Sequence, residues 1–210
     1  MEVKYIQHMG SDVMVVNSAR TSFNNDLLDK TELTEKDKKL LAYLAKHKHY
    51  TPFESCLLTV MVECPIAIRS QIMRHRTASY NEVSRRYTSE NIEFYQPNTL
   101  RQQDPKSKQS SYGVHKDSVP LLEEYTLHVT KAKVLYDKLI EAGVAKEQAR
   151  FILPQCTYTR FYMTMNLRNW VHLLSLRLDS HAQEEVRFIA LQIKEIMIPL
   201  FPESIKCLLP

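Results

Sequence analysis

Polar and apolar residues alternate along residues 158–166, the segment YTRFYMTMN. Because successive side chains of an extended chain point to opposite faces, this period of two predicts a β-strand. One face should lie in the core, and the other should form a cavity wall or a wet surface. The side chains expected to share the core face are Thr159, Phe161, Met163 and Met165. Residues 56–64 are rich in β-branched and apolar side chains and are bounded by Pro52 and Pro65, which predicts a second strand.

Helical periodicity accounts for much of the remaining chain. Apolar residues recur at the spacing of one helical face in residues 33–49, and Thr34 is placed to cap that helix. A short helix is expected over residues 65–76, with Pro65 in its first turn. Further helices are expected at about 118–142, closed by Gly143, at 146–153, ended by Pro154, and at about 168–178 and 181–199.

Together these elements predict an α+β fold, a helix-rich single domain over residues 1–210 around a small, mostly antiparallel sheet. The chain shows no internal repeat and no long linker, and its 210 residues fit one domain with a substantial core. Residues 98–113 are polar, with hardly any aliphatic side chains, and therefore predict a mobile loop.

The composition is that of an ordinary globular protein, with 44% hydrophobic and 25% charged residues and a net charge of +4. That charge is too small to indicate a nucleic-acid partner by itself. The four cysteines lie far apart, which predicts free thiols in a reducing compartment. No apolar stretch approaches the length of a membrane span, and the first residues lack a signal-peptide pattern. We therefore expect a cytoplasmic protein without a membrane partner.

Glycine is scarce. The chain has only Gly10, Gly113 and Gly143, and these cannot form either a dinucleotide-binding glycine fingerprint or a P-loop. Any phosphate that this protein binds must therefore be held by side chains, and arginine is the side chain best suited to that contact.

Positive charge is concentrated in residues 74–87, RHRTASYNEVSRRY, which hold four arginines and one histidine but only one acid, Glu82. Part of this charge needs no ligand, because the first three residues fall in the last turn of the helix predicted over residues 65–76, where each cation is favoured by about 0.3–1 kcal/mol. Arg85 and Arg86 lie beyond that helix, in a segment that its apolar and aromatic residues mark as packed. Packed arginines repel one another, so this part of the stretch favours a bound anion.

Three more arginines are candidates for the same chemistry. Arg150 lies within the predicted helix 146–153, and Arg168 and Arg177 bracket the next one, where Arg168 shares a face with His172. The alternative is an amphipathic helix whose arginines are simply exposed. No set of metal ligands is complete, and no cysteine has a neighbouring base, so neither a metal site nor a cysteine nucleophile is predicted.

Several segments carry a resemblance to a known family. Arg74, His75 and Arg76 are followed after seven residues by Ser84, and this pattern resembles the signature of the flavin-dependent thymidylate synthases. The similarity extends from about residue 12 to residue 200. The other segments that resemble the family, in the expected order, are HYTPFE at 49–54, GVAKEQARFILP at 143–154, YTRFYMTMNLR at 158–168 and LRLDSHAQ at 176–183.

This resemblance implies a reaction and a set of ligands. The family converts dUMP to dTMP by reductive methylation, with methylenetetrahydrofolate as carbon donor, NADPH as reductant and FAD as hydride carrier. The implied fold is α+β, and the implied active form is a homotetramer with FAD at subunit interfaces and no nucleic-acid partner. Hydride delivery from the flavin replaces enzyme-bound cysteine chemistry, which agrees with the missing nucleophile.

The resemblance also implies the residues of the site. Arg177 corresponds to the catalytic arginine that activates uracil by favouring ionisation at N3, a role that suits a permanently charged group. The expected dUMP contacts are Gln71, Arg74, Glu82, Val83, Ser84, Arg85, Arg86, Arg177 and, from a neighbouring subunit, Arg150. The expected FAD contacts are Thr51, Arg74, His75, Arg76, Glu82, Asn166, Arg168 and His172.

Two positions depart from the family pattern. Arg85 stands where a small residue is common, and His172 stands where an asparagine is common. Residues 98–113 have no clear counterpart, and we interpret them as a mobile cover that influences access of folate or NADPH. Two other hypotheses use the same arginines: a non-catalytic protein that binds nucleotides or nucleic acid, and a different flavoenzyme that acts on another nucleotide.

Overall fold

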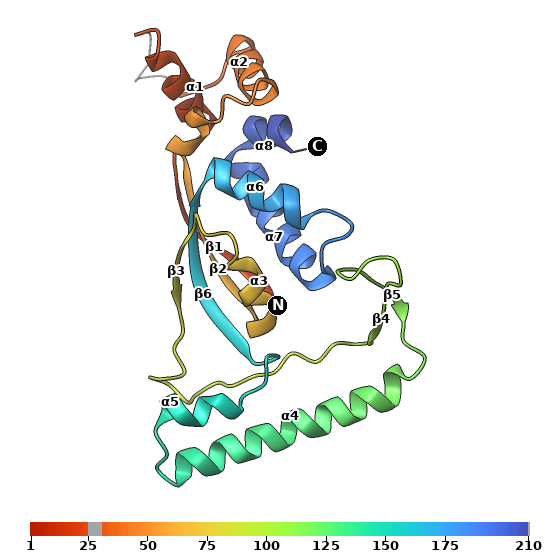
Figure 1. Ribbon diagram of the computed structural model, residues 1–210. Coiled ribbons are helices and arrows are strands. Elements are labelled where there is room, and N and C mark those ends of the chain that lie inside the picture. The colour runs from red at the N-terminus through yellow and green to blue at the C-terminus, as the bar shows by residue number, and fades with distance from the viewer. Residues whose placement is uncertain (25–30, 210) are drawn as a thin grey trace.

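The computed structural model describes residues 1–24 and 31–209 of the chain. Its centre is a four-stranded sheet with the order β1–β2–β6–β3, in which every pairing is antiparallel (Figure 1). The strands are β1 (Glu2–Met9), β2 (Leu57–Pro65), β3 (Ser79–Glu82) and β6 (Tyr158–Asn166). The two central strands, β2 and β6, pair along their whole length, from Leu57 opposite Asn166 to Pro65 opposite Tyr158. The predicted α+β class and antiparallel sheet are confirmed.

The alternation in β6 has the predicted consequence. Thr159, Phe161, Met163 and Met165 are all buried, while Tyr162 on the opposite face is 49% exposed. That opposite face lines part of a cavity of about 320 Å³, together with side chains of β1 and β3. The edge strands β1 and β3 were not predicted. In β1 only one of eight residues is buried, so its sequence carries no period-two signal.

Helices cover one face of the sheet. They include α3 (Ile66–Ile72), α6 (Leu167–Arg177) and α7 (Glu184–Leu200), and both α6 and α7 lie close to the predicted bounds (Figure 1). The indole Nε1 of Trp170 on α6 donates to the carbonyl of Leu58 at 3.0 Å, which ties α6 to β2. The largest fully buried side chains of this core include Trp170, Phe53, Phe161, Phe201 and Leu41.

The end of the sheet is closed by α1 (Asp12–Thr21), α2 (Glu35–Lys46), the 3-10 turn η1 (Thr51–Ser55) and α8 (Pro202–Leu208). Thr34 caps α2 as predicted, and Asp37 completes a capping box with it. Neither α1 nor α8 was predicted. Gly10, with φ +84°, connects β1 to α1, and a Cβ there would lie only 2.7 Å from Cys56 Sγ. This turn therefore requires glycine.

The long helix α4 (Ser118–Glu141) lies apart from the sheet and contacts mainly α5 (Lys146–Ala149) and the 3-10 turn η2 (Arg150–Ile152) (Figure 1). It ends as predicted, since Gly143 adopts φ +80° and the amides of Gly143 and Val144 bond to carbonyls of the last turn. Exposed apolar side chains, among them Val119 and Leu127, line much of its length. In the part of the chain that the structure describes, no helix combines the length and apolarity needed to cross a membrane.

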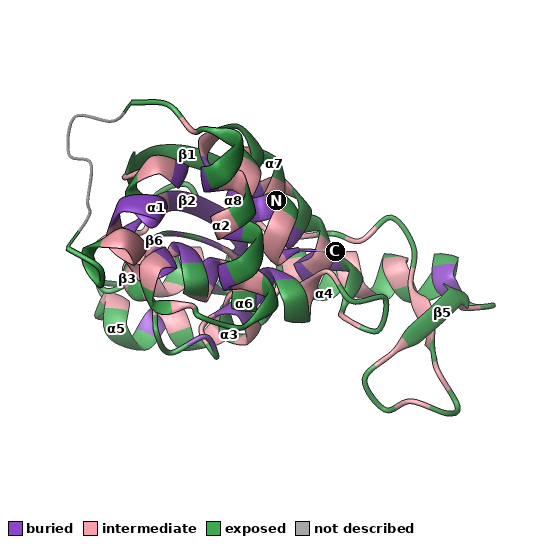
Figure 2. Cartoon of the chain, turned by 90° about the horizontal axis from the view of Figure 1, so that it is seen from above, coloured by how far each residue is buried: buried purple, intermediate pink, exposed green. Residues whose placement is uncertain are grey.

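Residues 98–113 differ from the prediction. They contain two paired strands, β4 (Arg101–Gln103) and β5 (Ser111–Val114), which form a hairpin at residues 101–114. Figure 2 shows β5 itself and the loop that precedes it as exposed or intermediate, whereas most buried residues gather at the central strands and the helices that cover them. The prediction of a loop failed because neither face of this hairpin packs in a core, so nothing demands an alternating apolar pattern. Backbone pairing and polar side chains hold it instead.

Helix α3 ends at Ile72, four residues earlier than predicted. Residues 74–76 therefore lie in the turn between α3 and β3 and not in the last helical turn.

Candidate functional site

Arg177, the last residue of α6, meets His75 in the turn after α3. Its Nε donates a hydrogen bond to His75 Nε2 at 3.0 Å, so this nitrogen must be the unprotonated acceptor of a neutral imidazole. The environment enforces that state. Burial, followed by the charges of Arg177 and His172, lowers the pKa of His75 to about 4. Two of the predicted residues are thus brought together, one as a fixed cation and the other as the neutral group that orients it.

A cavity of about 720 Å³ adjoins Arg177. It is lined by α3, the end of α6, the turn that follows α6 and the β4–β5 hairpin. The predicted residue Gln71 lies in its wall, and its side-chain Oε1 is buried without a hydrogen-bond partner. Among the described residues, the hydrogen bonds of Arg177 use only Nε. The residues that line the cavity therefore include an amide whose buried oxygen is unpaired and a guanidinium whose Nη groups are unpaired among the described residues.

A second cavity, of about 390 Å³, collects most of the other predicted nucleotide contacts. Glu82, Val83, Ser84 and Arg85 line it, and so does Arg150 from η2. The resemblance implied that a neighbouring subunit would bring Arg150 to these residues. Within one chain, Arg150 lines the same cavity as Ser84, whereas Gln71 and Arg177 line a different one, and the contribution of a neighbouring subunit stays a prediction.

The acidic residue of the second cavity is already paired. Glu82 forms an ion pair with Arg69 of α3 and accepts a hydrogen bond from Thr159 Oγ1 at 2.6 Å. Sequence reasoning missed Arg69, because nothing in the sequence marks a partner thirteen residues before Glu82. Arg85 is also engaged, since its Nη1 and Nη2 donate to the carbonyls of Glu90 and Asn91 at 2.5 and 3.1 Å.

Arg86 projects away from this group. Its guanidinium is 3.8 Å from the Glu147 carboxylate and lies over the Tyr87 ring at 5.8 Å. The contact with Glu147 of α5 is exposed and contributes little to stability.

The predicted flavin contacts gather around α6 and η1. Arg168 forms an ion pair with Glu54 and lies 5.6 Å above the ring of Tyr50, close to the predicted contact Thr51 at the start of η1. His172, one turn along α6, has its ring 6.1 Å from that of His75. Both Tyr50 and Glu54 fall within the segment HYTPFE, which was their only sequence signal.

Two of the predicted flavin contacts, Asn166 and Glu82, form other contacts within the protein. Asn166 caps α6, because its Oδ1 accepts from the amide of Asn169 at 2.9 Å. Glu82 lies in the second cavity, and no contact joins it to Arg168 or His172 among the described residues.

Arg74 and Arg76 are exposed, and within residues 1–24 and 31–209 their side chains form no hydrogen bond or ion pair. Their charges are therefore free to meet an anion such as a phosphate.

Two of the four thiols, those of Cys56 and Cys64, are unsuited to nucleophilic attack. Burial raises the pKa of Cys56 to about 11 and that of Cys64 to about 12. Both thiols stay protonated near neutral pH, and a protonated thiol is a poor nucleophile.

Known proteins match this chain over nearly its whole length. Residues 4–203 match the family model described as thymidylate synthase complementing protein. A flavin-dependent thymidylate synthase of Thermosipho melanesiensis is 39% identical over 196 residues, which cover 92% of this chain and 84% of that protein. A flavin-dependent thymidylate synthase of Thermus thermophilus is 39% identical over 200 residues, which cover 93% of this chain and 70% of that protein. The crystal structure of a UMP/dUMP methylase, PolB of Streptomyces cacaoi, bound with 5-Br dUMP has a TM-score of 0.89 at 32% identity and covers 98% of this chain and 93% of that one.

Proposed function

Because the chain belongs to the flavin-dependent thymidylate synthase family, we propose that it converts dUMP to dTMP by reductive methylation. Methylenetetrahydrofolate supplies the carbon, NADPH is the reductant, and FAD is the cofactor. The observation that supports this proposal best is the Arg177–His75 pair beside the Gln71 cavity. The other two hypotheses, a non-catalytic binding protein and a different flavoenzyme, have no such support from the site.

Arg177 acts on the uracil ring as a fixed cation. A guanidinium held next to the ring stabilises negative charge that develops on N3 and its neighbouring oxygens, without having to reorganise during the reaction. His75 keeps the guanidinium in place by accepting from its Nε, which leaves the two Nη groups for the substrate. Gln71 supplies an amide that can both donate to and accept from the polar edge of the ring.

The residues around α6 and the turn after α3 fit FAD. A flavin dinucleotide brings a pyrophosphate, and a chain without a glycine loop must neutralise it with side chains. The unpaired guanidiniums of Arg74 and Arg76 meet this need, and Arg168, His172 and Thr51 would hold the remainder of the cofactor. When bound and reduced by NADPH, FAD would supply the hydride that reduces the transferred carbon.

The nucleotide contacts of one chain lie in two cavities, which favours a shared site. Gln71 and Arg177 would meet the uracil ring of one dUMP, while Ser84 and Arg150 of another copy would meet its phosphate. Arg85 is occupied by carbonyls and Arg86 lies outside both cavities, so the geometry assigns a phosphate contact to neither. We propose a homotetramer with such shared sites. The exposed apolar side chains of α4 are suited to contacts between copies.

Turnover by the purified protein tests the proposal. Incubation with dUMP, methylenetetrahydrofolate, NADPH and FAD under anaerobic conditions should yield dTMP, detected by chromatography, and protein stripped of its FAD should yield none until FAD is added back. The protein itself should show a flavin spectrum. A colourless protein that binds RNA with steep salt dependence would instead support the nucleic-acid alternative. The cytoplasmic location stays a prediction.

A further inference from the structure

The β4–β5 hairpin forms one wall of the cavity beside Arg177. Its contribution includes Arg101, Gln103, Ser110 and Ser111, and the other lining residues include Gln71 and Arg177. The sequence placed this segment on the surface as a loop, yet it borders the proposed uracil site.

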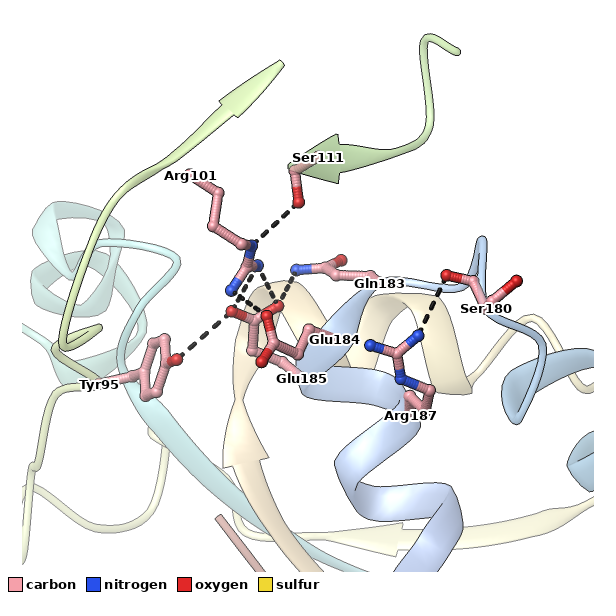
Figure 3. A network of polar contacts seen from close by, with 8 residues as sticks. All are labelled: Tyr95, Arg101, Ser111, Ser180, Gln183, Glu184, Glu185 and Arg187. Carbon is pink, nitrogen blue, oxygen red and sulfur yellow. Dashed lines mark hydrogen bonds and ion pairs between the residues drawn. The ribbon is translucent and has the colours of Figure 1, made fainter. Parts of the chain in front are cut away.

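Arg101 fastens the hairpin to the start of α7 (Figure 3). Its Nη2 donates to both carboxylate oxygens of Glu185, at 2.7 and 2.8 Å, and its Nη1 donates to Glu184 at 3.0 Å. Its Nε donates to the hydroxyl of Ser111 at 2.9 Å, so every nitrogen of the guanidinium has a protein partner. Arg101 lines a ligand cavity but is fully engaged, and it is therefore suited to positioning the hairpin and not to binding a substrate.

Glu185 is the buried half of this attachment. It is 7% exposed, and its carboxylate also accepts from Gln183 Nε2 at 2.9 Å and from the Tyr95 hydroxyl at 3.4 Å. Burial alone would raise the pKa of Glu185, but the hydrogen bonds from Arg101 and Gln183 hold it below its usual value. A buried carboxylate without its arginine would be an uncompensated charge, so the pair holds the hairpin firmly to α7.

Ser110 of the hairpin is one of the residues that line the cavity. Its Oγ is buried and, among the described residues, has no hydrogen-bond partner, as is also true of Oε1 of the lining residue Gln71. An isolated buried polar atom destabilises the protein, and two such atoms in one cavity are accounted for if a ligand pairs with both. A hydroxyl and a carboxamide can each donate or accept, which matches the alternating acceptors and donor of a uracil imide edge.

We propose that Ser110 is a further contact residue for the uracil nucleotide and that Arg101 and Glu185 are the residues that position it. The inference rests on the proposed function, because it takes the occupant of this cavity to be dUMP. It gives the hairpin a role in nucleotide recognition, which differs from the expected role of a mobile cover for folate or NADPH.

Removal of the hydroxyl tests the contact. Ser110→Ala should raise the KM for dUMP about two- to tenfold, the range that corresponds to one hydrogen bond, with little change in kcat or FAD content. Ser107→Ala is the matched control, since it deletes a hydroxyl from the same hairpin but outside the cavity lining and should leave the KM unchanged. Equal KM values for wild type and Ser110→Ala would overturn the contact.

Trypsin tests the attachment, because Lys106 and Lys108 are exposed at the tip of the hairpin. In the FAD-loaded protein, saturating dUMP should slow cleavage at these lysines, and Ser110→Ala should reduce that protection. Glu185→Gln should speed cleavage and raise the KM for dUMP. Glu184→Gln, which removes the exposed partner of Arg101, should change the cleavage rate and the KM for dUMP much less.

The two proposals fail in different ways. If dUMP protects the hairpin but no dTMP forms, the nucleotide contact stands and the proposed reaction is wrong. If dTMP forms while dUMP leaves cleavage unchanged and Glu185→Gln behaves like Glu184→Gln, the role of the hairpin is wrong. Should Glu185→Gln fail to fold, the comparison of Ser110→Ala with Ser107→Ala decides the matter alone.

Discussion

The two cavities that hold the predicted nucleotide contacts are built differently. In the first, Gln71 Oε1 and Ser110 Oγ are unpaired and Arg177 is held at one nitrogen only. In the second, Glu82 is paired with Arg69 and Thr159, and Arg85 is engaged by backbone carbonyls. The first cavity therefore has unpaired polar groups that could bind a planar ring with several hydrogen-bonding atoms. The second is lined by several arginines, and in it Arg150 and Ser84 are the proposed contacts for a phosphate.

The difference shows how one kind of side chain serves two purposes. Arg177 is useful because its position is fixed by a neutral histidine that adds no competing charge. Arg150 is useful because it adds positive charge to a cavity whose only acid is already neutralised by its own partner. Substitutions that affect one cavity should therefore leave the function of the other intact.

Arg177→Ala is expected to have the largest effect. Loss of the cation beside the uracil ring should lower kcat by about 10²–10³-fold, as for removal of one donor to a developing negative charge. FAD content and the flavin spectrum should stay unchanged. The control is Arg187→Ala on α7, whose guanidinium donates to the Ser180 carbonyl in the turn that follows α6. Full activity of Arg177→Ala would remove the assigned role.

Arg150→Ala should have the next largest effect, and this effect should be confined to binding of the dUMP phosphate. A lost charge-assisted hydrogen bond should raise the KM for dUMP by roughly 10- to 100-fold, with a smaller change in kcat. Deoxyuridine, which lacks the phosphate, is the matched substrate, and wild type and variant should turn it over at similar rates. If the variant loses as much activity with deoxyuridine as with dUMP, the division of labour between the cavities is incorrect.

His75→Gln should have the smallest effect, seen mainly in the pH dependence of stability. The pKa of His75 is about 4 in the folded protein, below its ordinary value of 6.5, so the unfolded chain binds more protons between these values. Folding stability from this group is thus fully present above pH 6.5 and is lost as pH falls toward 4. The free energy of unfolding, measured with denaturant at several pH values, should fall as pH is lowered from 6.5 toward 4. This fall should be about 1–3 kcal/mol smaller in the variant than in the wild type. Parallel curves for the two proteins would contradict a neutral, buried His75.

Local patterns predicted the parts of the fold that local physics controls. The alternation of residues 158–166 identified β6 and its buried face, because one side of that strand packs in the core. Thr34 and Gly143 marked helix ends, because capping depends on neighbours in the chain. The hairpin and β1 were not predicted. Their strands are held mainly by backbone pairing, and without a buried face they need no alternating apolar pattern in the sequence.

The resemblance named candidate residues for the site but not their grouping. The segments around 74–87 and 176–183 named Arg177, His75 and Ser84 as candidates, and the comparisons confirm the family. Their assignment to individual ligands stays a prediction. What separates Gln71 from Ser84, although both were expected to bind one nucleotide, is the path of the chain from α3 into β3.

The sequence by itself determined the family, the main helices, the two central strands and the need to bind phosphate without glycine loops. The family follows from the resemblance of several segments, and the other features follow from composition and from spacings of a few residues. Only the tertiary structure decided that Arg177 donates to His75, 102 positions away, and that Arg101 fastens a polar hairpin to Glu185, 84 positions away. Such contacts depend on how distant segments pack together, and a contact between distant segments imposes no period on the residues that lie between them.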